Sequence, residues 1–345
     1  MTKIFQATSM TLVLLMTATF SSNINAEDPP FEERADTRAF IDKMVKEHDF
    51  DKEKLKALFK KVKLREEVIS SMNTQAEAKP WYAYKKNLVT DARTQKGVEF
   101  WQQHVNALER AEQDYGIPPE IIIAILGIET NYGATQGSFR VLDTLATFGF
   151  EYPRRADFFK SELEAFLLLT RENDLDPIGI DGSYAGAIGQ PQFMPSSYRH
   201  YAVDYNGSGT ADLRNSVSDV IGSVANYLKE NGWKPGQAVI VQVEAVDENK
   251  HLEFYKLKPT HSIHKLQQRG IEITEDLPSD SLTTFVVLEG EDKPEHWVGF
   301  QNFYTISRYN PSKHYAMAVY QLAEKIKKNY KQKIEAESKT EAEEK

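Results

Sequence analysis

The chain has 345 residues, of which 41% are apolar and 11% aromatic, so it is long and apolar enough to fold around a sizeable core. Its formal net charge of -9 argues against a nucleic-acid-binding protein, because such proteins need positive charge to neutralise phosphate. The chain contains no cysteine, which excludes disulfides, a thiolate nucleophile and a cysteine-ligated metal.

The N-terminus has the organisation of a secretory signal peptide. One early lysine precedes an apolar stretch from about Met10 to Phe20, and small and polar residues ending in "NINA" follow. We expect cleavage after Ala26. The alternative is a membrane anchor, but the apolar stretch is shorter than the roughly 20 residues that a transmembrane helix needs. Since no cysteine follows the stretch, lipid attachment at a processed N-terminal cysteine is excluded, and we expect a soluble exported protein.

Helical patterns follow the N-terminal segment. Apolar residues recur at three- and four-residue spacing among charges in residues 37–63 and 97–115, which is typical of amphipathic helices. A third helix is expected to start at the Pro118–Pro119 pair, where a backbone N–H is not needed, and to end just before Gly133. Further helices are predicted over residues 156–171 and 216–231.

The third helix carries an acid, Glu129, at the end of an almost unbroken apolar run. Helical spacing puts Glu129 on the same face as Ile125 and Leu126. Loss of water at this face favours the protonated form and raises the pKa, as a carboxylic acid needs in order to donate a proton near neutral pH. The alternative is a glutamate that turns outward to water or pairs with an arginine such as Arg154 or Arg155.

Residues 182–198, "GSYAGAIGQPQFMPSSY", contain three glycines and two prolines, too many breakers for a regular element. Such a loop lets the backbone approach a ligand closely, and it carries Ser183, Gln192 and Tyr198 as neutral hydrogen-bonding groups. The alternative is an ordinary connection between helices.

After "GWKPGQ" the pattern becomes strand-like in three runs, "AVIVQVEAV", "LTTFVVLEG" and "WVGFQNFYTISRYN". These runs predict a smaller mixed or β unit over residues 236–306, after a helical region over residues 27–235. Residues 307–330 are expected to form a C-terminal segment and a helix that packs back on the helical region. Residues 331–345 are charge-rich without an apolar face, so we expect them to be frayed or disordered.

Five separated motifs occur in one order along the chain: "PPEIIIAILGIETNYG", "FEYPRRADFF", "GSYAGAIGQPQFMPSSY", "DLRNSVSDVIGSVANYL" and "NFYTISRYN". They resemble the motifs of the lytic murein transglycosylase B family, bacterial enzymes that cleave peptidoglycan, over about residues 79–323. The resemblance implies a mainly α, α+β fold with a lysozyme-like helical catalytic core, additional helices and a smaller β-containing unit. It also implies a periplasmic enzyme that acts on peptidoglycan glycan strands, with cell-wall synthases as candidate partners.

The resemblance assigns roles to individual residues. Glu129 matches the family's single catalytic acid/base. Residues that match the lining of the catalytic cleft are Ser183, Gln192, Tyr227 and Asn310, and those that match contacts to the glycan or its peptide stem are Tyr84, Arg154 and Arg155. A tyrosine can stack on a sugar face and arginines suit carboxylates, whereas core tyrosines and solvated arginines are the alternative.

The implied chemistry uses one carboxylate where most glycosidases use two. Glu129 first protonates the glycosidic oxygen between N-acetylmuramic acid and N-acetylglucosamine. It then accepts a proton from the muramyl C6 hydroxyl as that hydroxyl closes onto C1. The product is a 1,6-anhydromuramyl end, and the chemistry requires no cofactor.

Residues 204–219, "DYNGSGTADLRNSVSD", begin like an EF-hand calcium loop, with polar or acidic residues at positions one, three and five and a glycine at position six. Asn215 replaces the usual bidentate glutamate at position twelve, and the resemblance implies that a later acid takes over. The implied ligands are Asp204, Asn206, Ser208, the backbone carbonyl of Thr210, and Asp219. Such an ion would be structural, because a closed loop of oxygen ligands leaves no reactive water. The alternative is a turn without an ion.

Two other functions stay open: a hydrolytic muramidase with the same glutamate, and a non-catalytic peptidoglycan-binding or scaffolding protein. The reaction products separate the first from a lytic transglycosylase, and replacement of Glu129 separates the second. No Walker or G-x-G-x-x-G loop occurs, so we expect no nucleotide cofactor.

Overall fold

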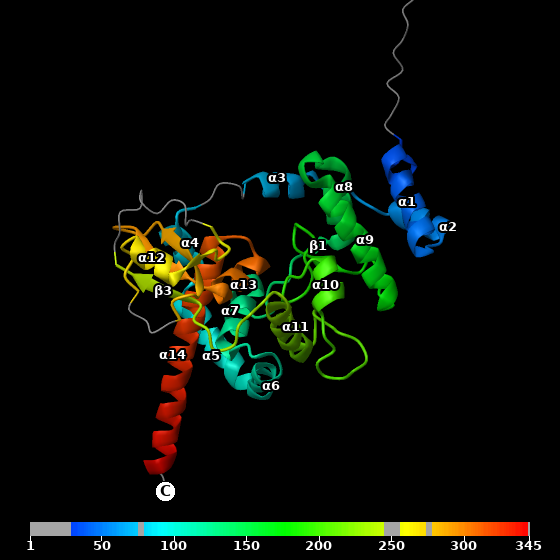
Figure 1. Cartoon of the computed structure of the whole chain (residues 1–345). Helices are drawn as coiled ribbons and strands as arrows, with labels where there is room; N and C mark the ends of the chain where they lie inside the picture. Colours follow the sequence, from blue (N-terminus) through cyan, green and yellow to red (C-terminus); the bar gives the residue numbers. More distant parts are fainter. Residues whose placement is uncertain (1–28, 75–78, 245–255, 274–277, 344–345) are drawn as a thin grey trace, which may run out of the picture. The chain divides into compact units, whose positions relative to one another are not determined.

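The computed structural model describes residues 29–74, 79–244, 256–273 and 278–343 (Figure 1). The predicted signal peptide, residues 1–26, lies outside these residues. The chain divides into two compact units, residues 1–60 and 61–345. The described residues form fourteen α-helices and two small antiparallel sheets, which confirms the predicted mainly α, α+β class.

The first unit contains a short 3-10 helix, η1 (Phe31–Glu33), followed by α1 (Ala35–His48) and α2 (Lys52–Phe59). The amphipathic pattern of residues 37–63 is interrupted at Asp49, which ends α1 in a left-handed conformation with a φ of 55°. Asp51 then starts α2, because its side chain accepts a hydrogen bond from the Lys54 N–H (2.9 Å). Phe40 and Phe59 pack together in the small core, with ring centroids 5.8 Å apart.

The second unit is mainly helical. Its helices are α3 (Glu66–Thr74), α4 (Trp81–Leu88), α5 (Asp91–Gln103), α6 (Val105–Tyr115), α7 (Pro119–Thr130), α8 (Val141–Glu151), η2 (Pro153–Arg155), α9 (Ala156–Glu172), α10 (Pro195–Tyr201), α11 (Val217–Glu230), α12 (Ile263–Gln268), α13 (Gln301–Tyr309) and α14 (Lys313–Glu343). The pattern of residues 97–115 is divided between α5 and α6 at His104. Among the described helices, none combines the length and apolarity needed to span a bilayer.

Helix α7 lies in the middle of this unit. Almost all of its residues are buried, as expected for a helix that is apolar all round. Helices α5, α6, α11 and α14 pack against it, and Figure 1 shows α7 beside α5 and α14. The acid at the end of α7 is therefore positioned by several elements that are distant in sequence.

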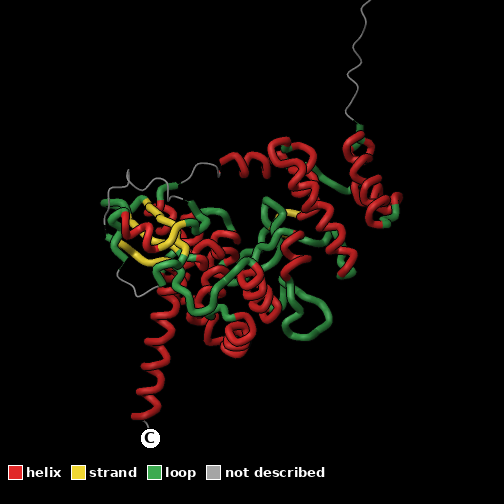
Figure 2. The backbone as a smooth tube through the Cα atoms, in the orientation of Figure 1, coloured by secondary structure: helices red, strands yellow, loops and turns green. Residues whose placement is uncertain are grey.

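A four-stranded antiparallel sheet contains β3 (Ile240–Val243), β4 (His261–Ser262), β5 (Leu282–Leu288) and β6 (Glu295–Gly299) in the order β3-β6-β5-β4. Figure 2 shows these strands gathered at one side of the larger unit. In the register, Val298 of β6 pairs with both Val241 and Phe285. The sheet and α12 share a small core of Ile263, Leu266, Ile271, Phe285, Val298 and Phe300. Elsewhere, β1 (Phe139–Arg140) pairs with β2 (Asp181–Gly182).

Two expectations about the C-terminal part are wrong. The third strand-like run is a strand only as far as Gly299, and Gln301–Tyr309 form α13, because Phe300, Phe303 and Ile306 recur at helical spacing and are buried. Residues 331–343, expected to be frayed or disordered, continue α14. Their lysines, glutamates and alanines favour helix, and Lys333 Nζ donates a hydrogen bond to Gln102 Oε1 of α5 (2.7 Å).

Candidate active site

Glu129 lies in the last turn of α7, and the turn after it is tightly fixed. Asn131 and Tyr132 both have positive φ angles, 51° and 63°, which stop the helix. The Tyr132 hydroxyl donates a hydrogen bond to the Arg93 carbonyl oxygen of α5 (2.7 Å). Gly127 allows this close approach, since a Cβ atom there would lie 2.6 Å from the hydroxyl and would displace it. These contacts hold the end of α7, and with it Glu129, against α5.

The Glu129 side chain is enclosed by protein but keeps partial access to solvent. Burial raises its pKa to about 7, and a hydrogen bond from Tyr315 opposes the rise. This bond joins the Tyr315 hydroxyl to Glu129 Oε1 over 2.6 Å. Among the described residues, no arginine forms an ion pair with Glu129. A carboxyl group with this pKa is available as a proton donor at neutral pH and as an acceptor once it has lost its proton.

Four tyrosines, here called the tyrosine group, gather near the acid from four different helices: Tyr84, Tyr227, Tyr309 and Tyr315. Burial, and then the charge of Glu129, raise the pKa of Tyr84, Tyr309 and Tyr315. Tyr227 adjoins them, with its ring centroid 4.8 Å from that of Tyr309. Its hydroxyl donates a hydrogen bond to the Arg308 carbonyl oxygen (2.7 Å). The immediate neighbours of the acid are thus neutral hydroxyl groups on apolar rings.

Sequence reasoning missed Tyr309 and Tyr315. Tyr309 ends α13, and its hydroxyl donates a hydrogen bond to the Pro191 carbonyl oxygen in the 182–198 loop (2.6 Å). Its ring stacks against Tyr315 with centroids 6.3 Å apart. Tyr309 directly precedes Asn310 in the motif "NFYTISRYN", which was a usable signal. Tyr315 gave none, because in an amphipathic helix it has the pattern of an ordinary core residue.

The 182–198 loop lies against the end of α7. Thr130 Oγ1, next to the acid, donates a hydrogen bond to the Gln190 carbonyl oxygen (2.8 Å). Gln192 has a φ of 52°, and its side-chain amide donates to two backbone carbonyl oxygens (2.8 and 3.2 Å). Ser183 Oγ accepts a hydrogen bond from the Ala187 N–H (3.0 Å), and no described residue takes its proton. The loop therefore presents at least one hydroxyl donor that a ligand could use.

Three other predicted residues face solvent. Arg154 and Arg155 lie in η2, and the Arg155 guanidinium sits 4.3 Å from the ring centroid of Phe158 in α9. Asn310 follows Tyr309 at the end of α13. Within the described parts of the chain, none of the three forms a hydrogen bond with Glu129 or the tyrosine group. Asn310 lies beside the site because it follows Tyr309 directly. Arg154 and Arg155 are exposed and accessible to a ligand that extends beyond Glu129.

The predicted calcium loop is organised around Asp204. Its Oδ2 atom accepts a hydrogen bond from the Gly209 N–H (2.7 Å), and Oδ1 accepts one from the Ser208 N–H (2.9 Å). These bonds, that from Gly209 first, lower the pKa of Asp204 and keep it ionised. Ser208 Oγ also donates to the Thr210 carbonyl oxygen (3.1 Å), and Asn206 Oδ1 accepts a bond from the Ser208 N–H (2.8 Å). The oxygens of these four residues lie within one turn and are of the kind that calcium prefers.

Asp219 occupies a different environment. It is fully buried, and its Oδ1 atom accepts hydrogen bonds from the N–H groups of Tyr205 (2.9 Å) and Asn206 (3.1 Å). Its Oδ2 atom accepts a third bond from the Asp212 N–H (3.0 Å). Asp219 therefore ties the loop to the start of α11. Both Asp204 and Asp219 accept N–H bonds on each carboxylate oxygen, but Asp219 is fully buried whereas Asp204 is only partly buried and Asn206, Ser208 and Thr210 are exposed. The last four residues are therefore the accessible ones for a hard cation.

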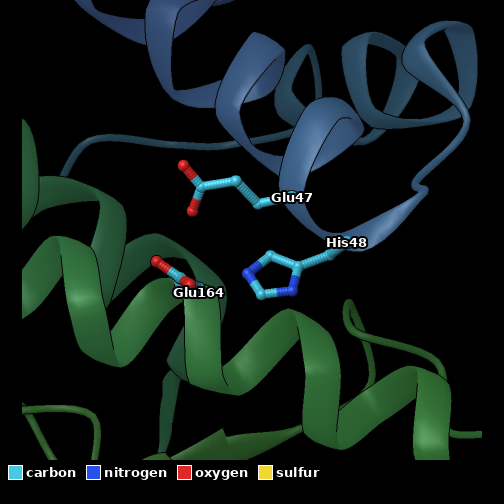
Figure 3. A group of neighbouring side chains, drawn as sticks. All are labelled: Glu47, His48 and Glu164. Atoms are coloured by element: carbon cyan, nitrogen blue, oxygen red, sulfur yellow. The ribbon is translucent and has the colours of Figure 1, made fainter.

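Figure 3 draws a further group of acidic and imidazole side chains. Glu47 and His48 are neighbours at the C-terminal end of α1, and Glu164 belongs to α9. The first two residues lie in the N-terminal unit and the third lies in the larger unit.

Comparison with known proteins supplements this geometry. The family model described as "Transglycosylase SLT domain" matches residues 32–324. Membrane-bound lytic murein transglycosylase B of Escherichia coli (strain K12) is 42% identical over 324 residues, which is 91% of this chain and 86% of that protein.

Solved structures agree with the sequence comparison. Catenated lytic transglycosylase SltB1 from Pseudomonas aeruginosa aligns with a TM-score of 0.83 and 43% identity, over 87% of this chain and 99% of that chain. The Escherichia coli lytic transglycosylase Slt35, in complex with calcium, aligns with a TM-score of 0.80 and 41% identity, over 86% of this chain and 94% of that chain.

Proposed function

The chain belongs to the transglycosylase SLT domain family, and from this membership we propose the reaction in which Glu129 takes part. The protein is an enzyme, a lytic transglycosylase that acts on peptidoglycan, and its fold is the lysozyme-like fold of these relatives. The observation that carries the proposal is a single enclosed carboxyl group with a pKa of about 7 that accepts a hydrogen bond from Tyr315.

Glu129 acts first as the acid and then as the base. It donates its proton to the glycosidic oxygen between N-acetylmuramic acid and N-acetylglucosamine as the bond from that oxygen to C1 breaks. The muramyl C6 oxygen then bonds to C1 and passes its proton to the Glu129 carboxylate. The product is a 1,6-anhydromuramyl end, and Glu129 is again protonated, so protons balance over one cycle. A pKa near 7 suits a group that must both give and take a proton.

The substrate replaces the second carboxylate of an ordinary glycosidase. Its C6 hydroxyl is the nucleophile, and intramolecular attack avoids the entropy of capturing a separate reactant, an advantage that can reach several kcal/mol. The Tyr315 hydroxyl stabilises the carboxylate after the first proton transfer, because a hydrogen bond to the charged form favours it.

The remaining predicted residues hold the glycan. The Tyr84 ring is partly exposed, and its hydroxyl makes no hydrogen bond to another described residue, so it can stack on a sugar and bond to it. Neutral groups around the acid are supplied by Ser183, Gln192, Tyr227 and Asn310. Arg154 and Arg155 are exposed cations that suit the carboxylates of lactyl or peptide groups.

Purified protein incubated with peptidoglycan sacculi tests this reaction. We expect release of soluble muropeptides whose muramyl ends are inert to borohydride, because an anhydro end has no free aldehyde. Released fragments that borohydride reduces would instead indicate a muramidase, and no release at all would indicate a binding protein.

We also propose that Asp204, Asn206, Ser208 and the Thr210 carbonyl hold a structural calcium ion, with Asp219 shaping the loop. The calcium complex of Slt35 supports the proposal, as does the turn of oxygen atoms described above. Calcium is not required for the chemistry, since every proton transfer goes through Glu129.

Calcium is expected to raise the melting temperature, because an ion that binds only the folded state stabilises it by mass action, by about 2.7 kcal/mol at 100 times Kd. Asp204→Ala should abolish the rise. Melting curves are recorded with millimolar calcium and with chelator, so that any loss of stability from the substitution itself cancels. Superimposable curves for the unsubstituted protein would favour a turn without an ion.

The compartment is proposed to be the periplasm, with cleavage after Ala26. N-terminal sequencing of the protein from a periplasmic fraction is expected to begin at Glu27.

Cell-wall synthases are proposed as partners, because they make the strands that this enzyme cleaves.

A further inference from the structure

Glu289, the residue that follows β5, forms hydrogen bonds with the first turns of α4 and α14. Helix α4 carries Tyr84 and helix α14 carries Tyr315. The Glu289 backbone carbonyl accepts a hydrogen bond from the Tyr82 N–H of α4 (3.1 Å). The Glu289 carboxylate contacts His314 Nε2 (3.2 Å) and Lys313 Nζ (3.5 Å) at the start of α14. Lys313 Nζ also donates to the Val287 carbonyl oxygen (2.6 Å). Because a carboxylate can only accept, His314 Nε2 is the donor to Glu289.

His314 fills the space behind Tyr84. Its side chain is 12% exposed, and its ring centroid lies 5.6 Å from that of Tyr84 and 5.9 Å from that of the fully buried Trp81. Burial, and then the charge of Lys313, lower the pKa of His314, so the ring packs as a neutral group near neutral pH. The His314 ring therefore packs against the Tyr84 ring, and its hydrogen bond to Glu289 holds it in place.

The same segment connects Tyr84 to the acid. His314 directly precedes Tyr315, which donates the hydrogen bond to Glu129. Burial, and then the charge of Glu129, raise the pKa of Tyr84, which is consistent with a position close to the acid. His314, whose side chain is 12% exposed, packs against the Tyr84 ring.

We propose that His314, held by Glu289, is a positioning residue that fixes the ring of Tyr84 for glycan binding beside Glu129. The inference rests on the proposed role of Tyr84. Without the imidazole ring, Tyr84 gains rotational freedom that must be lost again when a sugar binds. We expect binding to weaken about 3- to 10-fold, which corresponds to ordering one side chain.

A double-mutant cycle in the Glu129→Gln protein tests this positioning role, with binding measured by calorimetry on a soluble glycan tetramer of alternating N-acetylglucosamine and N-acetylmuramic acid. His314→Ala should weaken binding about 3- to 10-fold when Tyr84 is present and should have no further effect beside Tyr84→Ala. Equal weakening in both backgrounds, or none in either, would overturn the inference. Since Glu129→Gln prevents turnover, the result does not depend on which product the unsubstituted enzyme forms.

Two conservative variants of His314 distinguish the effect of ring packing from the effect of the hydrogen bond to Glu289 and from a general loss of folding. His314→Phe keeps a ring behind Tyr84 and should retain most of the affinity, whereas His314→Gln keeps a donor for Glu289 without a ring and should bind as weakly as His314→Ala. If His314→Ala does not fold, this pair decides the question. A His314→Phe protein that folds, by its melting curve, but binds as weakly as His314→Gln would contradict the packing role.

Discussion

Replacing Glu129 by glutamine is expected to lower the rate of muropeptide release by on the order of 10⁴-fold, the upper end of what general acid/base catalysis contributes. Glutamine keeps the size of the side chain but can neither give nor take the required proton. Because one carboxyl group serves both steps, no neighbouring group can take over. The rate is measured as soluble muropeptides released from sacculi per unit of folded protein.

Glu120→Gln is the matched control for this substitution. Glu120 is a second buried glutamate of α7, but it lies in the first turn and pairs with Lys327 of α14 (2.7 Å). The substitution is expected to leave turnover per folded molecule near that of the unsubstituted enzyme. A Glu129→Gln protein with near-normal turnover would remove Glu129 from the mechanism.

The stability of Glu129→Gln should also differ from that of the unsubstituted protein, in a pH-dependent way. The pKa of Glu129 is about 7 when folded, against an ordinary value of 4.5. Between these values the unfolded chain binds fewer protons than the folded one, so the stability of the unsubstituted protein falls as pH rises through this range. Glutamine does not titrate, so the free energy of unfolding of the variant does not fall in this way. The difference in free energy of unfolding, variant minus unsubstituted protein, should therefore increase by at most about 3 kcal/mol from pH 4 to pH 8.

The pH dependence of kcat/KM is expected to show a falling limb that begins at about 7, the pKa of Glu129. The reaction starts from the protonated acid, so activity is retained below this pKa and falls about tenfold per pH unit above it. Activity at pH 9 should therefore be roughly 100-fold lower than at pH 6. Initial rates on a soluble glycan across this range measure the limb.

The Tyr315→Phe variant tests whether the falling limb of kcat/KM reports the pKa of Glu129, because the direction in which the limb moves can be predicted. The Tyr315 hydrogen bond lowers the pKa of Glu129, so its removal should move the falling limb to higher pH. Tyr227→Phe is the control, because the Tyr227 hydroxyl bonds to the Arg308 carbonyl oxygen and not to the acid. A limb that moves to lower pH in Tyr315→Phe, or moves equally in both variants, would contradict the assignment.

The acid could be anticipated from the sequence because its setting is local. Helical spacing alone places Glu129 beside the apolar residues of α7, and its raised pKa agrees with that expectation. The turn of the calcium loop was visible for the same reason, since Asp204 and Ser208 are four residues apart and hydrogen-bonded in the structure.

Features that depend on distant contacts could not be read from the sequence. Tyr315 lies 186 residues from Glu129 and reaches it only because α14 packs on α7. The tail of α14 was expected to be disordered because its charges have no apolar stripe, yet Lys333 finds a partner in α5. Asp219 was expected to face an ion, and only the fold reveals the three N–H groups that it binds.

The central claim is that the substrate's own C6 hydroxyl, and not water, attacks C1. Digestion of sacculi in H₂¹⁸O followed by mass spectrometry of the released muropeptides tests it most directly. We predict muramyl ends that are lighter than the hydrolysis product by one water and that contain no ¹⁸O. Ends that carry one ¹⁸O atom at the full mass of the hydrated sugar would contradict this account and identify the enzyme as a muramidase.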